Sequence, residues 1–183
     1  MAKTVLIPLA PGFEEIETIT VVDILRRAGA RVTLAGTQAG PIEGSRGVRI
    51  LPDELLEALS AENFDLIVLP GGQPGTTNLQ NSSTVLDLLQ NMHSQDKYIA
   101  AICAAPLVLQ TAGVLQKARI TSHPSVKEQL GEVPYQEERV VEDHKIITSR
   151  GPGTAMEFAF KLVEILFGKE RVEKVNAGVM ARI

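Results

Sequence analysis

Short runs of almost continuous apolar residues alternate with longer amphipathic stretches along the whole chain. The runs at Lys3–Leu9, Phe64–Leu69 and Tyr98–Ile102 have the length of strands whose two faces are both buried. The stretches between them carry apolar residues at helical spacing. This alternation predicts an α/β fold, in which right-handed crossovers place helices on both faces of a mostly parallel sheet.

Turn and cap residues set the bounds of the expected elements. Pro11-Gly12 ends the first strand, and a helix with carboxylates in its first turns follows and stops at Gly29. Its expected buried stripe consists of Ile16, Ile19, Val22 and Leu25. Further strands are expected at Ala30–Ala35, Ala118–Thr121 and Arg139–Ser149 (folded at Glu142-Asp143), with a hairpin within Gly40–Leu51. Further helices are expected at Pro52–Leu59, Ser82–His93, from about Pro106 to near Gly113, from Gly151 to Gly168, and from Lys169 to about Asn176.

The composition bounds the class of protein. A length of 183 residues without a visible linker or repeat predicts one domain, 1–183. The charge of −4 and the lack of a basic run argue against a nucleic-acid or anionic-membrane surface. There is no apolar stretch of about 18 residues and no signal-peptide pattern, so we expect a cytoplasmic protein.

The chain has a single cysteine, Cys103. One cysteine excludes an internal disulfide and a Cys-rich zinc site, and no His/Asp/Glu cluster has metal-ligand spacing, so we expect no metal. Cys103 follows a buried strand directly, and Pro106 stands near the first position of the next helix. Such an elbow presents a nucleophile at the carboxyl edge of a sheet. A helix N-terminus there predicts a lowered thiol pKa, and small residues at 104 and 105 leave amides for an oxyanion. An inert core cysteine is the alternative.

A reactive thiol needs a group that handles protons. His123 follows a short strand at the same edge and is the best histidine candidate, although a loop histidine without function stays open. Glu17 lies one turn into the first helix, where partial burial would raise its pKa and let it donate to a thiolate. A solvated first-turn glutamate is the alternative interpretation of Glu17.

The loop Pro70-Gly71-Gly72 lacks the spacing of either common phosphate-binding motif. A glycine pair after a strand instead allows a backbone amide to approach a neighbouring elbow closely. The sequence therefore favours thiol chemistry over nucleotide binding.

Five separated motifs occur in an order that resembles a known family. They are Glu14-Glu15-Ile16-Glu17, Leu69-Pro70-Gly71-Gly72, Ala100-Ala101-Ile102-Cys103-Ala104-Ala105-Pro106, Thr121-Ser122-His123-Pro124 and Thr148-Ser149-Arg150-Gly151-Pro152-Gly153-Thr154. Together they resemble the ThiJ/PfpI superfamily, and most of all the branch of the Parkinson's-disease-associated protein deglycase and its bacterial relatives. The resemblance runs nearly end to end. It implies a flavodoxin-like three-layer sandwich, a homodimer and no organic cofactor.

The resemblance also implies roles for seven residues. Cys103 matches the nucleophile, Glu17 the protonated glutamate beside it, and His123 the nearby histidine; Gly72 and Ala104 match the oxyanion amides, and Glu14 and Arg46 match residues near the site at the dimer interface. The implied activity is a glyoxalase that needs no glutathione, or a deglycase. It converts methylglyoxal, glyoxal or their early adducts to hydroxy acids through a hemithioacetal on the cysteine.

Two departures and one alternative qualify that expectation. Ala104 stands where the peptidase-like branch has a histidine, which argues against protease activity. The chain also lacks a second cysteine that could resolve an oxidised thiol. The alternative function is a redox sensor or holdase chaperone, in which Cys103 is oxidised to a sulfinic acid. The same residues serve both functions.

Overall fold

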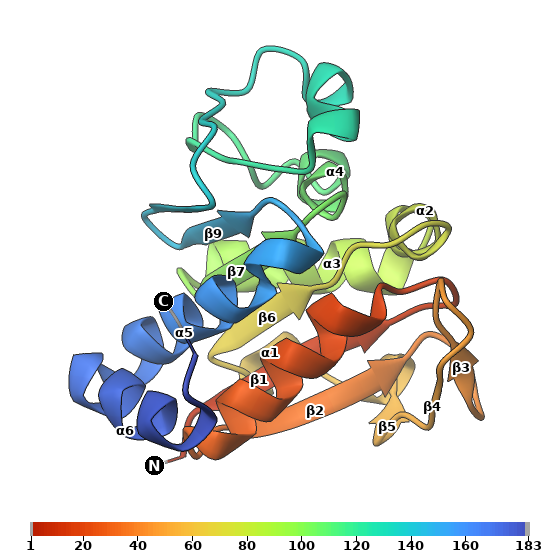
Figure 1. Cartoon of the computed structure of the whole chain (residues 1–183). Coiled ribbons are helices and arrows are strands. Elements are labelled where there is room, and N and C mark those ends of the chain that lie inside the picture. Colours follow the sequence, from red (N-terminus) through yellow and green to blue (C-terminus); the bar gives the residue numbers. More distant parts are fainter. Residues whose placement is uncertain (1, 182–183) are drawn as a thin grey trace.

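The computed structural model describes residues 2–181 (Figure 1). Seven strands form one sheet in the order β5-β2-β1-β6-β7-β9-β8, parallel throughout except for β8, which runs antiparallel to β9. The sheet strands are β1 (Thr4–Leu9), β2 (Arg31–Gly36), β5 (Glu54–Leu55), β6 (Leu66–Leu69), β7 (Tyr98–Ile102), β8 (Val140–Asp143) and β9 (Ile146–Ser149), and a separate hairpin pairs β3 (Ile42–Glu43) with β4 (Arg49–Ile50). The α-helices are α1 (Glu15–Arg27), α2 (Gly75–Gln80), α3 (Ser83–Ser94), α4 (Pro106–Thr111), α5 (Ala155–Phe167) and α6 (Lys169–Val179).

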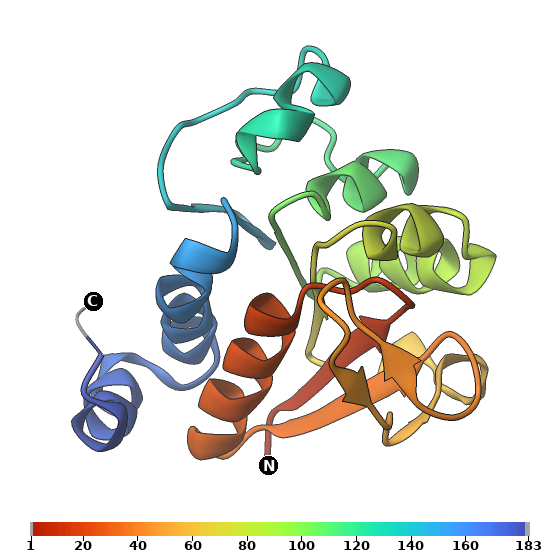
Figure 2. The ribbon, with the colours of Figure 1, turned by 45° about the vertical axis from the view of Figure 1, so that its right-hand side comes forward.

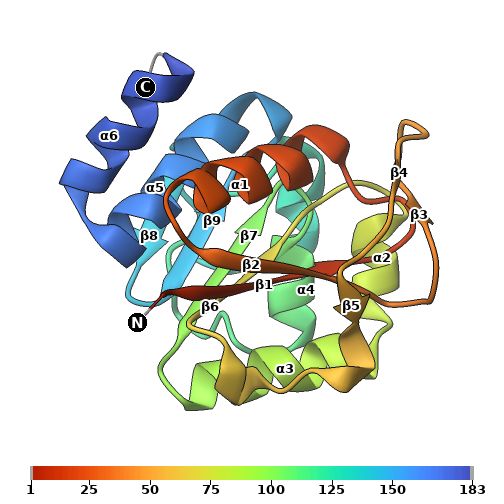
Figure 3. The same cartoon turned by 90° about the horizontal axis from the view of Figure 1, so that it is seen from below.

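Helices cover both faces of the sheet. Figure 3 shows α1, α5 and α6 on one side and α3 with α4 on the other. The two apolar cores follow from the pleat of the strands: in β1, Leu6 packs into one core, whereas Val5 and Ile7 pack into the other. The predicted flavodoxin-like sandwich is therefore confirmed.

Three loops meet at the carboxyl edge of the central strands β1, β6 and β7. The backbone N–H of Glu14 donates to the carbonyl of Gly71 over 2.9 Å, which joins the first loop to the second. The N–H of His123 donates to the carbonyl of Cys103 over 2.8 Å. The segment that carries His123 belongs to an excursion above the sheet edge, visible at the top of Figure 2. A Cβ on Gly71 would lie 2.7 Å from the Cβ of Cys103, so the second and third loops are adjacent as well.

The buried stripe predicted for α1 is wrong at two positions. Ile16 and Ile19 are 56% and 45% exposed, whereas Val22 and Leu25 are buried. A helix turns about 100° per residue, so four residues at a spacing of three span half of its circumference and share no face. The buried apolar face instead adds Val21 and Ile24 to the two correct residues.

Other local predictions differ from the structure where strand pairing or the position of a turn determines the secondary structure. The Pro52–Leu59 segment was expected to be a helix, but it begins as the edge strand β5 and continues as a 3₁₀ turn, because its backbone pairs with β2. Ala118–Thr121 makes only an isolated bridge, at Ile120 with Tyr135. The β8–β9 hairpin turns after Asp143, slightly beyond the expected position, and the short helix α2 was not predicted. No helix in residues 2–181 has the length and apolar character needed to cross a membrane.

Candidate active site

Cys103 sits on a sharp turn between β7 and α4. Its backbone has φ = +65°, a left-handed conformation that is rare for a residue with a side chain. The N–H of Cys103 donates to the carbonyl of Ser149 over 2.9 Å, and its own carbonyl accepts from His123. Both sides of the turn are therefore fixed by neighbouring segments, and Pro106 begins the helix that follows. Strained residues of this kind cluster at functional sites.

A cavity of about 300 Å³ opens in front of the thiol. The lining residues come from the loops after β1, β6, β7 and β9, from the β3–β4 hairpin and from the His123 segment. They are Glu14, Ser45, Arg46, Gly72, Gln73, Cys103, Ala104, His123, Ser125, Val126 and Pro152. Six of the seven residues singled out from the sequence thus lie around one cavity. The seventh, Glu17, lies behind the cysteine and does not line it.

The Glu17 side chain is only 1% exposed. Its Oε2 accepts from the N–H of Gly71 over 2.8 Å, while Oε1 has no hydrogen-bond partner among the described residues. Burial raises the pKa of Glu17 from its ordinary 4.5 to about 7, against the lowering effects of the Gly71 amide and of the Cys103 thiol. Glu17 is therefore a buried acid that holds a proton close to neutral pH, and Oε1 is the atom free to carry it.

The thiol of Cys103 does not follow the pKa expectation drawn from the helix N-terminus. Burial, then the charge and hydrogen bond of the Glu17 carboxylate, raise the pKa of Cys103 to about 12. The amides of Ala104 and Gly72 lower the pKa but do not prevail. Because the carboxylate charge disappears when Glu17 is protonated, the pair favours one negative charge over two. A thiolate thus forms most easily while Glu17 keeps its proton.

Gly72 and Ala104 present their backbone amides to the sulfur. Gly72 has φ = +91°, and a Cβ at this position would lie 2.5 Å from both the nitrogen of Glu14 and the carbonyl oxygen of Gly12. Only glycine fits such a position, which lets the loop after β6 approach the elbow. Two converging amides beside a nucleophile can stabilise a developing oxyanion.

His123 is exposed at the cavity and caps a 3₁₀ segment, Pro124–Leu130. The ring nitrogen Nδ1 lies 2.8 Å from the hydroxyl of Ser125 and accepts from the N–H of Ser125 over 3.2 Å. These two contacts fix the ring. The other two histidines lie elsewhere: His93 contacts Gln116, and His144 is an exposed turn residue paired with Asp143.

The first turn of α1 holds the mouth of the cavity together. Glu14 caps the helix by accepting from the N–H of Glu17 over 2.7 Å. The buried carboxylate of Glu15 accepts from the Ser45 hydroxyl at 3.1 Å and from the Arg46 amide at 2.6 Å. Burial opposes its ionisation, but these hydrogen bonds prevail and lower the pKa of Glu15. Glu15 thus anchors the β3–β4 hairpin, whose tip carries Arg46 to the cavity.

Several residues with a part in this site were not identified from the sequence. Ser45, Gln73 and Ser125 contribute polar groups to the cavity lining, and Glu15 anchors the hairpin. The neighbours Ser45-Arg46 and the spacing His123-Pro124-Ser125 were available as signals, since a polar residue two positions after a cap reaches back to it.

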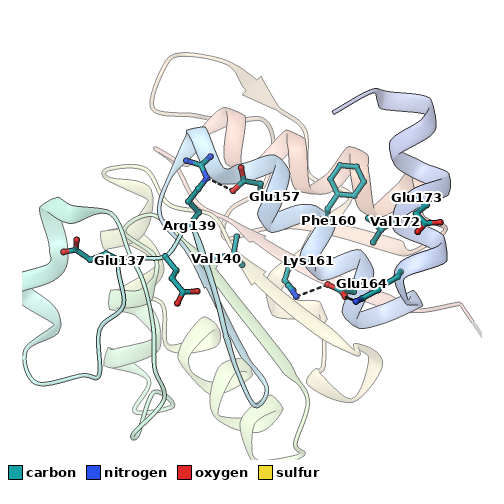
Figure 4. A pocket seen from close by; sticks show the side chains of 11 residues that line it. Glu137, Arg139, Val140, Glu157, Phe160, Lys161, Glu164, Val172 and Glu173 are labelled. Carbon is teal, nitrogen blue, oxygen red and sulfur yellow. Dashed lines mark hydrogen bonds and ion pairs between the residues drawn. The ribbon is translucent and has the colours of Figure 1, made fainter. Parts of the chain in front are cut away.

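A larger cavity lies away from Cys103. It measures about 720 Å³ and lies between the approach to β8 and the helices α5 and α6 (Figure 4). Ion pairs line its rim, Arg139 with Glu157 at 2.6 Å and Lys161 with Glu164 at 2.8 Å. It contains no cysteine or histidine. The size of a cavity therefore does not identify the reactive site.

Among residues 2–181, no group of three or more His, Cys, Asp or Glu side chains is arranged to hold a metal ion.

Comparison with known proteins identifies the family of the chain. The family model described as "DJ-1/PfpI family" matches residues 3–165. The chain belongs to the DJ-1/PfpI family. Protein dj-1beta of Drosophila melanogaster is 49% identical over 183 residues, covering 98% of each chain, and its crystal structure matches with a TM-score of 0.97 over the whole of both chains, at 47% identity.

The names of two further relatives state a chemical property, an enzymatic activity in one and an oxidised state in the other. The glutathione-independent glyoxalase DJR-1.2 of Caenorhabditis elegans is 40% identical over 176 residues, covering 94% of each chain. The structure of oxidized Toxoplasma gondii DJ-1 matches with a TM-score of 0.96 at 40% identity over the whole of both chains.

Proposed function

We propose that this protein is a cofactor-independent glyoxalase that converts methylglyoxal or glyoxal to a hydroxy acid through Cys103, and that it also acts as a deglycase on early adducts of these aldehydes. The observation that carries the proposal is the buried acid Glu17, whose unpartnered Oε1 lies behind a strained cysteine. Such a reaction moves a proton between adjacent carbons of the aldehyde adduct. It needs a nucleophile and one acidic group that both gives and takes a proton. The name of the relative DJR-1.2 supports the same activity.

The reaction begins when the Cys103 thiolate adds to the aldehyde carbon of methylglyoxal. The oxygen becomes negative beside the amides of Gly72 and Ala104, and protonated Glu17 neutralises it, which leaves a hemithioacetal and a Glu17 carboxylate. That carboxylate removes the hydrogen of the former aldehyde carbon as a proton and returns it to the neighbouring carbon, while the hydroxyl proton of the hemithioacetal passes to the former ketone oxygen, which yields a thioester of lactate. Water hydrolyses the thioester and restores the thiol. The sum is one methylglyoxal and one water converted to one lactate and one proton.

The test is lactate formation from methylglyoxal by the purified protein, with glycolate from glyoxal as the second substrate. Cys103→Ala is expected to abolish turnover in a folded protein, because no other thiol is available. The control is His144→Ala, an exposed turn residue outside the cavity, which is expected to retain turnover. Unchanged turnover in Cys103→Ala would refute the mechanism.

A second function, redox sensing or holdase chaperoning, rests on the same pocket. The amides of Gly72 and Ala104 and a protonated Glu17 can stabilise a sulfinate as well as an oxyanion. The oxidised state named for the Toxoplasma gondii relative favours it. Mass spectrometry after mild peroxide separates the two functions: a gain of two oxygens at Cys103 without lactate formation supports the sensor, and lactate formation supports the enzyme.

We also propose that the protein acts as a homodimer. Ile16, Ile19 and Val48 are roughly half exposed, and Glu15 joins the start of α1 to the hairpin that carries Val48. Exposed branched apolar side chains on adjacent elements are typical of a surface covered by a partner. A small aldehyde as the substrate and a cytoplasmic location remain predictions from the sequence.

A further inference from the structure

His123 can serve a reaction in two opposite ways. A neutral imidazole carries one proton, so the nitrogen with the proton donates and the other accepts. Whether the nitrogen that faces the substrate is a donor or a base depends on the hydrogen bond that the other nitrogen makes. The contacts of His123 decide between these possibilities.

A backbone amide settles the protonation of Nδ1. The N–H of Ser125 points at Nδ1 of His123 over 3.2 Å, and an amide N–H can only donate. Nδ1 must therefore offer a lone pair. The Ser125 hydroxyl, 2.8 Å from the same nitrogen, is free to rotate and donate as well. A proton on Nδ1 would face the amide hydrogen, so the neutral ring carries its proton on Nε2.

Nε2 is the nitrogen that remains for a bound molecule. Among the described residues it has no hydrogen-bond partner, and His123 and Ser125 both line the cavity in front of Cys103. The protonated nitrogen is thus the one left to contact substrate oxygen.

We propose that Ser125 is a positioning residue that holds His123 in the tautomer protonated at Nε2, so that His123 acts on the substrate as a hydrogen-bond donor and not as a base. This inference rests on the proposed glyoxalase function. It assigns proton removal from carbon to Glu17 alone and gives His123 the substrate oxygen, beside the amides of Gly72 and Ala104. A donor of this kind is worth most when negative charge develops on that oxygen.

The tautomer can be observed without any substrate. Long-range ¹H–¹⁵N correlation spectra of the histidine rings separate protonated from unprotonated nitrogens, and His123→Gln assigns the signals among the three histidines. We expect Nε2 of His123 to be protonated and Nδ1 to be unprotonated in the neutral ring. The opposite tautomer, or an even mixture, would overturn the proposal.

Ser125→Asp tests whether Ser125 sets that tautomer. The backbone amide of residue 125 remains in this variant and still points at Nδ1. A carboxylate only accepts, and its charge-assisted bond to a ring N–H is stronger than the neutral amide contact, so it draws the ring proton to Nδ1 and leaves Nε2 as a base. Ser125 is exposed, so the substitution leaves the core intact. We expect the spectra to show a protonated Nδ1 and kcat for methylglyoxal to fall at least about tenfold, with a smaller change in KM. An unchanged tautomer, or a changed tautomer with unchanged kcat, contradicts the role of Ser125.

Two controls separate positioning from other effects. Ser125→Thr keeps both the amide and a hydroxyl, and it is expected to recover the wild-type tautomer and most of kcat. Alkylation of Cys103 by neutral iodoacetamide at fixed pH reports whether the new charge in Ser125→Asp suppresses the thiolate. If the wild-type protein forms no lactate, the glyoxalase proposal fails, while the tautomer assignment is still decided by the spectra.

Discussion

Glu17→Gln should change how the stability of this protein depends on pH. In the folded state the pKa of Glu17 is raised to about 7, and its ordinary value is 4.5. Between these two pH values the unfolded chain has lost the Glu17 proton and the folded chain has kept it, so the free energy of unfolding falls as pH rises. The stability contribution is fully present below pH 4.5 and is lost as pH passes about 7.

The magnitude follows from the same two values. Each pKa unit corresponds to about 1.4 kcal/mol, so the interval from 4.5 to about 7 corresponds to about 3 kcal/mol. The Glu17 side chain is 1% exposed, so solvent screens little of this free energy. Glutamine has a similar shape and does not titrate. The variant should therefore gain about 3 kcal/mol relative to wild type between pH 4.5 and pH 8.

Urea unfolding followed by circular dichroism at a series of pH values measures the difference between the two proteins. Titrating groups that do not interact with Glu17 cancel in that difference, whereas Cys103 and Glu14 are coupled to it. The two proteins are therefore measured again with Cys103→Ala in both, which removes the coupling to the thiol. A difference in stability that stays constant from pH 4.5 to pH 8 in the Cys103→Ala background would refute the buried, protonated Glu17.

Two further predictions concern the first turn of α1 and its surface. A Cβ on Gly44 would lie 2.6 Å from Oε1 of Glu15, so Gly44→Ala should displace that carboxylate, loosen the hairpin and raise KM for methylglyoxal more than it lowers kcat. Gly178→Ala, where a Cβ meets no atom within 4 Å, is the matched control, and equal KM values for the two variants would contradict the anchor. Ile16→Asp together with Ile19→Asp should convert the proposed dimer to a monomer in sedimentation velocity. A mass that is the same for this variant and wild type would show that this face is not the interface.

Much of the fold could be predicted because local patterns and packing agree. Buried strands read as apolar runs, and the residues that follow them, such as Gly72 and Cys103, break the chain at one sheet edge. The prediction of secondary structure failed where the local sequence pattern and the pairing of strands favour different structures. The Pro52–Leu59 segment has helix-forming residues, but the free edge of β2 pairs with its backbone.

The candidate site was predictable in its membership and less so in its electrostatics. Glu17 differs from Glu14 and Glu15 only in the direction in which it leaves the helix, and that direction depends on where the helix packs. The thiol pKa depends on the balance between burial, a buried carboxylate and two amides, and no local pattern measures that balance. The same holds for the tautomer of His123, which depends on one amide of the following turn.

Four consecutive residues at the start of α1 point in four directions. Glu14 lines the cavity, Glu15 anchors the hairpin, Ile16 faces outward and Glu17 lies behind the cysteine. Because each residue turns the helix by about 100°, a single inserted or deleted residue here would rotate every one of these groups to the wrong place. The register of this turn therefore links the surface, the hairpin and the thiol, so that one change of length disrupts all three.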